Sequence, residues 1–307
     1  MDEIKPVRLQ RGDLVGVITP AGPIELEKLE LGIAFLKEQG LKVKMGNSVG
    51  RSYGYLGGTD AERLEDLHQM FRDPEIKGIF CARGGYGTAR FASQIDYGLI
   101  KNNPKIFWGY SDITFLHTAI NQHTGLCTFH GPMIGSDLGR ESVHPVSKQC
   151  FSQLFEPKEF IYTEELSPLE VVVEGYAEGP IVGGNLTLAI STMGTKFEID
   201  TTGKLFLIED INEEPRAVDR MLNQLLLSGK LQAASGIIIG DFCNCTSRSD
   251  QSLTLDEVIN YYVRLAGKPA IKGFKIGHCN PNIAIPLGVH ATLNTSKKKL
   301  TIKNGVI

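Results

Sequence analysis

Hydrophobic and polar residues follow two different periods along the first half of the chain. Short apolar runs predict strands at residues 13–18, 41–45, 78–82, 105–110 and 127–131. Leucines and alanines at helical spacing lie between these runs, and one helical stretch opens with the capping box Thr59-x-x-Glu62. This alternation predicts a doubly wound, mostly parallel sheet with helices on both faces.

The pattern changes in the second half of the chain. Polar residues and prolines flank one amphipathic stretch at 146–155 and predict a connection with a single helix. Beyond it we expect strands at residues 171–176, 204–208 and 236–240, a glycine turn at 183–184, and helices at 215–227 and 254–265. The expected domains are an N-terminal α/β domain over 1–142, a connection over 143–168, and a smaller α/β domain of mixed sheet over 169–307.

Composition excludes several classes of protein. The chain has 307 residues, enough for two domains, and its net charge of −3 offers no basic patch for nucleic acid. It has no run of about 18 apolar residues, so we expect no membrane partner. The polar N-terminus does not resemble a signal peptide, and the six cysteines form no closely spaced framework. We therefore expect a cytoplasmic protein with reduced thiols.

Ser111 is the strongest candidate for chemistry because it lies on an expected strand-to-helix corner. The predicted strand 105–110 precedes it, and residues 112–121 carry apolar positions at helical spacing. Such a corner exposes a hydroxyl and places the first N–H groups of the helix beside it, so a nucleophile and half of an oxyanion site can arise together. The alternative is a serine that only caps the helix, which is a common role for this residue.

A glycine-rich loop, Arg83-Gly-Gly-Tyr-Gly87, follows another predicted strand. Its glycines permit a close backbone approach, and its N–H groups suit negative charge. The loop lacks the spacing of a dinucleotide site and the lysine of a P-loop, and a phosphate loop or a plain tight turn are the alternatives. Because ligands gather at the carboxyl ends of parallel strands, residues 19–23, 83–87 and Ser111 should meet at one rim.

Candidate acids and bases lie mainly in the second half. Glu209 and Asp210 end a predicted strand, where a solvated strand end is the competing interpretation because exposed carboxylates are the norm. His278 lies in a turn-rich loop and is suited to proton transfer, and His130 is the one other histidine on the expected rim. No metalloprotease motif is present, and the Cys-x-Cys pair at 243–245 is by itself a poor zinc site.

Serine, acid and histidine in this order form a coherent acyl-transfer set, and the strings around them resemble the LD-carboxypeptidase family of serine peptidases. That family includes enzymes that trim murein tetrapeptides and the microcin C self-immunity proteins. The similarity runs nearly end to end, through residues 16–23, 83–87, 109–114, 130–133, 183–186, 207–210 and 277–282, followed by 285–288. Each of these sequence motifs alone would be weak evidence, but all of them in the same order are specific for the family.

The resemblance implies that Ser111 is the nucleophile, Glu209 the acid and His278 the general base, with no cofactor and no metal. The implied oxyanion donors are the backbone N–H groups of Asp112 and of a glycine in the 83–87 loop, which we expect to be Gly85. Because the serine and the other two residues lie in different expected domains, the site is expected in an interdomain cleft. The implied reaction releases terminal D-alanine from murein peptides during peptidoglycan recycling, and a homodimer is expected.

Such an enzyme must also recognise a free carboxylate. Arg83 is the candidate, through a charge-assisted hydrogen bond, and an equal alternative is that it only braces its own loop. The sequence leaves both diaminopimelate and lysine open at the third position of the stem peptide, with or without attached sugar.

Two other functions compete with this one. The microcin-immunity branch stacks a nucleotide base on a tryptophan of the second domain, but the only tryptophan here, Trp108, lies in the strand before the nucleophile. This weakens the alternative, although Tyr176 offers another aromatic face. The other hypothesis is a non-catalytic binder of peptides or nucleotides, which predicts tight binding without turnover.

Overall fold

A computed structural model describes residues 2–140 and 142–307. Met1 and Glu141 lie outside the described residues, and both belong to the expected N-terminal domain over 1–142. The chain forms two compact units. Unit 1 comprises Met1–Lys158, Ile283–Gly288 and Asn304–Ile307, and unit 2 comprises Glu159–Asn282 and Val289–Lys303.

Unit 1 contains a six-stranded sheet with the strand order β12-β5-β4-β3-β1-β2. Its five parallel strands are β1 (Leu14–Ile18), β2 (Lys42–Met45), β3 (Ile76–Cys81), β4 (Ile106–Gly109) and β5 (Thr128–His130). The sixth strand, β12 (Ile285–Leu287), pairs antiparallel with β5. The predicted parallel sheet is confirmed.

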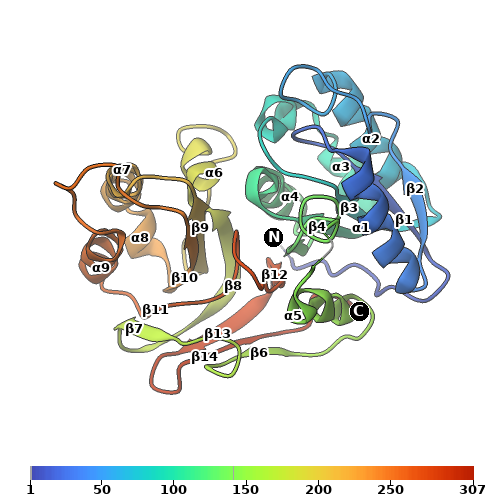
Figure 1. Ribbon diagram of the computed structural model, residues 1–307. Helices are drawn as coiled ribbons and strands as arrows, with labels where there is room; N and C mark the ends of the chain where they lie inside the picture. The colour runs from blue at the N-terminus through green and yellow to red at the C-terminus, as the bar shows by residue number, and fades with distance from the viewer. Residues whose placement is uncertain (1, 141) are drawn as a thin grey trace. The chain divides into compact units, whose positions relative to one another are not determined.

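Helices cover both faces of this sheet (Figure 1). One face carries α2 (Asp60–Arg72), α3 (Tyr97–Asn102) and α4 (Thr114–Thr124), which share a buried cluster with Ile79 and Phe107. The other face carries α1 (Leu26–Glu38), the short α5 (Pro145–Gln149) and the 3₁₀ helix η4 (Cys150–Leu154). There the ring centroid of Phe151 lies 4.5 Å from that of Trp108 and 4.8 Å from that of Phe35. Neighbours on one strand, Phe107 and Trp108 thus point to opposite helical layers.

Unit 2 contains an eight-stranded mixed sheet with the order β6-β14-β13-β8-β9-β10-β11-β7. Its central parallel strands are β8 (Tyr176–Asn185), β9 (Leu205–Ile211), β10 (Gly236–Cys243) and β11 (Ala270–Lys272). The antiparallel outer strands are β6 (Phe160–Tyr162), β7 (Glu170–Val173), β13 (His290–Asn294) and β14 (Lys299–Ile302). The helices are α6 (Leu186–Ser191), α7 (Pro215–Leu227), α8 (Lys230–Ala233) and α9 (Leu255–Ala266). The predicted α/β class with a second, mixed sheet is confirmed.

One expected element is wrong. Gly183 and Gly184, which were expected to form a turn, lie inside the ten-residue strand β8. Their φ angles are +104° and +132°. A Cβ on Gly183 would lie only 2.2 Å from the carbonyl oxygen of Leu207 on the neighbouring strand. The glycines therefore allow β8 to approach β9 closely, a role that local sequence pattern does not distinguish from a chain reversal.

The contact units and the expected domain boundaries are different divisions of the chain. Helix α5 and η4, from the expected connection, belong to unit 1, and so do β12 and the last four residues. β12 covers the edge of the parallel sheet that β5 would otherwise leave unpaired. Local pattern assigns no partner to so short a strand.

Candidate active site

Ser111 lies at a strained strand-to-helix corner. β4 ends at Gly109, Ser111 begins the 3₁₀ helix η3 (Ser111–Ile113), and α4 follows directly. Ser111 has a φ of +61°, in the left-handed region that residues other than glycine rarely adopt. The cap positions of η3 and α4 are Tyr110 and Ile113, so the interpretation of Ser111 as a simple helix cap is wrong. This conformation at the end of a parallel strand is typical of a nucleophile elbow.

The glycine-rich loop after β3 passes directly beside Ser111. A Cβ on Gly84 would lie 3.0 Å from the Cβ and 3.1 Å from the Oγ of Ser111, so a glycine here leaves room for the hydroxyl. The N–H of Gly22 donates to the carbonyl oxygen of Gly84 at 2.9 Å, which joins the loop after β1 to the loop after β3. The expectation that the three loops meet at one rim of the sheet is confirmed.

Asp112 ties the residue after the serine to the glycine-rich loop. Its buried carboxylate accepts the N–H of Thr88 at 2.9 Å, and its backbone carbonyl accepts the Thr88 hydroxyl at 2.8 Å. Burial raises the pKa of Asp112, and the hydrogen bonds from Thr88 oppose this shift. Gly85, the expected oxyanion donor, lies three residues before Thr88 with a φ of +113°. The backbone on its C-terminal side is therefore fixed to the neighbour of Ser111.

Arg83 makes a contact within its own unit. Its Nη1 donates to the carbonyl oxygen of Pro23 at 2.8 Å, and its side chain is exposed. The arginine thus braces the loop after β3 against the loop after β1. Recognition of a substrate carboxylate by Arg83 stays a prediction.

Unit 2 holds a buried carboxylate–imidazole pair. Glu209, in β9, is fully buried, and its Oε2 lies 2.7 Å from Nδ1 of His278. Burial raises the pKa of Glu209, and the adjacent His278 opposes that shift. Asp210 is also buried and accepts hydrogen bonds from Asn185 Nδ2 at 2.9 Å and from the Thr187 N–H at 3.0 Å, at the start of α6. The interpretation of these two carboxylates as a solvated strand end is wrong.

A glycine allows the histidine loop to approach the buried acid. Gly277 has a φ of +113°, and a Cβ there would lie 2.4 Å from Oε2 of Glu209. Its N–H donates to Oδ1 of Asn282 at 3.2 Å, which closes the turn that carries His278. The imidazole therefore meets the carboxylate only because residue 277 lacks a side chain.

Two histidines of unit 1, His117 and His130, have packing roles. His117, in α4, is fully buried, and its Nε2 lies 2.8 Å from the carbonyl oxygen of Gly109. Burial lowers the pKa of His117 to about 4. His130, expected on the rim, is fully buried in β5 and lies edge-on to Tyr110, with ring centroids 5.5 Å apart.

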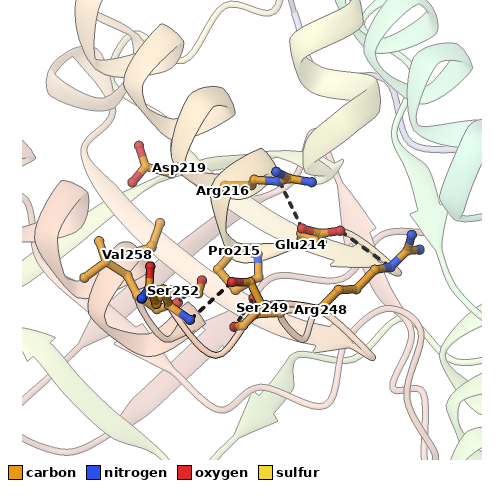
Figure 2. A pocket seen from close by; sticks show the side chains of 11 residues that line it. Glu214, Pro215, Arg216, Asp219, Arg248, Ser249, Ser252 and Val258 are labelled. Atoms are coloured by element: carbon orange, nitrogen blue, oxygen red, sulfur yellow. Dashed lines mark hydrogen bonds and ion pairs between the residues drawn. The ribbon is translucent and has the colours of Figure 1, made fainter.

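A pocket of about 560 Å³ opens at the start of α7, where Glu214 pairs with Arg216 at 2.9 Å and with Arg248 at 3.5 Å (Figure 2). Successive side chains along β9 point to opposite faces of the sheet. The hydroxyl of Thr187 donates both to Oδ2 of Asp210 and to Sδ of Met221 in α7, so Asp210 lies on the α7 side of the sheet. Glu209 consequently points to the opposite side. The pocket is therefore separate from the Glu209–His278 pair.

Two absences concern the described residues alone. Within 2–140 and 142–307, no group of three or more histidine, cysteine, aspartate or glutamate side chains is arranged to hold a metal ion. In the same ranges no helix has both the length and the apolar character needed to cross a membrane.

Each unit thus carries part of the expected site. Unit 1 carries Arg83, Gly85, Ser111 and Asp112, and unit 2 carries Glu209 and His278. Their assembly into one catalytic site stays a prediction.

Solved structures with the same fold span nearly the whole chain. A MccF-like protein from Bacillus anthracis str. Ames has a TM-score of 0.88 at 28% identity, covering 98% of this chain and 99% of that one. A muramoyltetrapeptide carboxypeptidase from Oxalobacter formigenes has a TM-score of 0.86 at 26% identity, covering 96% and 100%. Fold and site elements together define a two-unit α/β protein with serine and histidine loops at the ends of parallel strands.

Sequence comparison identifies the family. Residues 15–131 match the LD-carboxypeptidase N-terminal domain, and residues 178–293 match the LD-carboxypeptidase C-terminal domain. The chain is also 57% identical over 303 residues to the "probable murein peptide carboxypeptidase" of Bacillus subtilis (strain 168), covering 98% of this chain and 95% of the relative. The chain belongs to the LD-carboxypeptidase family, and it is a carboxypeptidase, a hydrolase of peptide bonds.

Proposed function

We propose that this protein is a serine-type LD-carboxypeptidase that releases terminal D-alanine from murein tetrapeptides. The murein substrate is supported by the 57% identity to the probable murein peptide carboxypeptidase of Bacillus subtilis, which extends across both units. The serine mechanism is carried by one observation, the left-handed backbone of Ser111 beside a glycine that leaves room for its hydroxyl. The proposed setting is cytoplasmic recycling of cell-wall peptides.

In the proposed reaction the Oγ of Ser111 attacks the carbonyl carbon of the residue before D-alanine. His278 takes the serine proton on Nε2, since its Nδ1 is already bonded to Glu209. The N–H groups of Gly85 and Asp112 stabilise the oxyanion, each contributing about 3 kcal/mol. His278 then protonates the leaving D-alanine amine, and the peptide acyl group stays on Ser111.

The second half of the reaction releases the peptide. A water molecule gives a proton to His278 Nε2 and attacks the acyl carbon, and His278 returns that proton to the Oγ of Ser111. Glu209 accepts the Nδ1–H throughout, holds the imidazole tautomer and stabilises the imidazolium. The proposed chemistry uses no metal, so EDTA should leave turnover unchanged.

The microcin-immunity alternative requires an aromatic face for a nucleotide base. Trp108 does not offer one, because it is fully buried, donates its indole N–H to the carbonyl oxygen of Pro132 at 2.7 Å, and packs against Phe151. Trp108 is a core residue of unit 1. Tyr176, the other aromatic residue considered for this role, is 59% exposed.

A comparison of substrates on one preparation tests the proposal. The substrates are L-alanyl-γ-D-glutamyl-L-X-D-alanine tetrapeptides, with X either meso-diaminopimelate or lysine, and an aminoacyl-sulfamoyl adenosine. We expect release of free D-alanine from a tetrapeptide with a higher kcat/KM than cleavage of the adenosine analogue, and no release by Ser111→Ala. A higher kcat/KM for the analogue would move the protein to the microcin-immunity branch. Tight binding of either substrate without turnover would support the non-catalytic binder.

A further inference from the structure

Arg63 is a charged side chain buried completely inside unit 1. It lies near the start of α2 and is 0% exposed. Its Nη1 donates to the carbonyl oxygens of Pro20 and Gly87, the latter at 3.0 Å, and its Nη2 donates to the carboxylate of Asp60. Removing a guanidinium from water is costly, so its position depends on keeping these bonds.

The two carbonyl groups belong to the two loops that border the serine. Pro20 lies in the loop after β1, and Gly87 ends the glycine-rich loop after β3. A Cβ on Gly87 would lie 2.9 Å from Nη1 of Arg63, so the contact also depends on the glycine. The buried guanidinium of Arg63 therefore fixes the backbone of both the loop after β1 and the loop after β3.

The predicted oxyanion donor lies within the segment that Arg63 holds. Gly85 is two residues before Gly87, whose carbonyl oxygen accepts from Arg63. The next residue, Thr88, donates its N–H to Asp112. The C-terminal side of the oxyanion loop is thus held between a guanidinium on one side and a carboxylate on the other.

Residues outside the loops hold Arg63 in turn. Asp60 accepts hydrogen bonds from Arg90, whose Nε lies 2.9 Å from Oδ1 and 3.1 Å from Oδ2 and whose Nη2 lies 2.9 Å from Oδ2. The bond to Arg90 keeps the pKa of Asp60 below its usual range, so the carboxylate beside Arg63 stays charged. The ring of Phe91 lies 5.0 Å from the Cζ of Arg63 and packs against the cation.

We propose that Arg63 is a positioning residue that holds the backbone of the oxyanion loop for the transition state. The inference rests on the proposed function, because it takes the Gly85 N–H as an oxyanion donor for the Ser111 reaction. A displaced oxyanion donor weakens an interaction made mainly in the transition state. Loss of Arg63 should therefore lower kcat and leave KM nearly unchanged.

The test compares Arg63→Met with the wild-type enzyme on the murein tetrapeptide, with rates expressed per folded molecule. We expect kcat for D-alanine release to fall by about tenfold or more, with KM within about threefold of the wild-type value. Arg63→Lys should recover part of the loss, because an ammonium group can still donate to one of the two carbonyl groups. A peptide boronate, which forms a tetrahedral adduct on serine, should lose affinity in parallel with kcat/KM, whereas the tripeptide product should not.

Lys105→Met is the matched control. Lys105 is also a buried cation of unit 1, and it donates to the carbonyl oxygens of Met70 at 2.8 Å and of Asp73, at the opposite end of α2 from Arg63. Its loss should lower the Tm without changing kcat per folded molecule. This control separates positioning of the site loops from general stabilisation of the unit.

Each remaining outcome decides the matter. If Arg63→Met does not fold, Arg63→Gln is measured by the same criteria. A kcat within about threefold of wild type, a change confined to KM, or an equal loss of kcat in Lys105→Met would overturn the role of Arg63. Full activity of Ser111→Ala would instead reject the proposed function, so the two failures are distinguishable.

Discussion

The left-handed backbone at Ser111 should lower the free energy of unfolding, an effect that can be measured separately from activity. A left-handed conformation costs roughly 1–2 kcal/mol for residues with a Cβ, and glycine avoids most of that cost. Ser111→Gly should therefore be more stable than Ser111→Ala by about 1 kcal/mol, while both lose turnover. Urea unfolding of the two variants measures the difference. Equal stability would mean that position 111 is not held in the left-handed region.

The Glu209–His278 pair gives a second expectation at the residue scale. Glu209→Gln should lower kcat by about 10³–10⁴ because the amide no longer selects the productive imidazole tautomer. His278→Ala should cost at least as much, and Ser111→Ala combined with His278→Ala should be no slower than either single variant. D-alanine release is the measurement. Additive losses, or a His278→Ala enzyme with near-normal kcat, would contradict the assignment.

At the scale of single residues, the sequence predicts which side chains are suited to catalysis better than it predicts how buried those side chains are. Ser111 and His278 follow from local strings, whereas burial of Glu209 goes against the usual exposure of carboxylates. Arg63 gave no local signal, because an arginine in the first turns of an amphipathic helix is ordinarily a surface residue. Its carbonyl partners are set by loops far away in the sequence.

At the scale of elements, His117 fastens α4 to the end of β4. Its folded pKa of about 4 lies below the ordinary value near 6.5, so the unfolded chain binds a proton over this range while the folded chain does not. The free energy of unfolding therefore keeps its full value, as far as His117 is concerned, above about pH 6.5. It decreases as the pH falls toward 4, by about 3 kcal/mol in all. His117→Gln should show a flatter dependence of unfolding free energy on pH. Parallel curves for the two proteins would exclude this role.

The loop after β3 gives an expectation of a different kind. In Gly84→Ala the new methyl group would meet Ser111 and the Cε of Met133, which lies 2.8 Å from its position. The serine hydroxyl must shift, so kcat should fall by about tenfold or more. Gly98→Ala, which places a methyl group near Asp96 alone within α3, is the control and should keep wild-type kcat. Normal activity of Gly84→Ala would show that the loop can move away.

Elements are predictable where the signal is local. The capping box at Thr59, the helix expected over 254–265 and the apolar strands of the parallel sheet lie where the pattern places them. The glycines of β8 were misinterpreted because their requirement comes from the carbonyl of Leu207 on another strand. Strand β12 was missed for the same reason, since its partner β5 is distant in sequence.

At the scale of the whole molecule, unit 1 is not a continuous stretch of chain. The last residues return to it: the N–H of Arg8 donates to the carbonyl oxygen of Ile307 at 2.9 Å, and the N–H of Ile307 donates to that of Pro6 at 3.0 Å. A fragment of residues 1–158 lacks β12 and these bonds, and it leaves β5 as an uncovered edge. We expect it to aggregate or to lack a cooperative thermal transition in circular dichroism. A stable, cooperatively folding fragment would contradict this dependence. The homodimer stays a prediction, which light scattering of the full chain tests.

The return of β12 and the C-terminal residues to unit 1 also affects how the protein is made. Synthesis runs from the N-terminus, and domains usually fold as they emerge from the ribosome. Here the sheet that carries Ser111 gains its edge strand β12 only after residues 159–282 of unit 2 have been translated, and the hydrogen bonds of Arg8 and Pro6 with Ile307 form later still. The complete fold around the serine can therefore form only after most of unit 2 has been synthesised, so a nascent chain that has not yet reached β12 carries no finished peptidase.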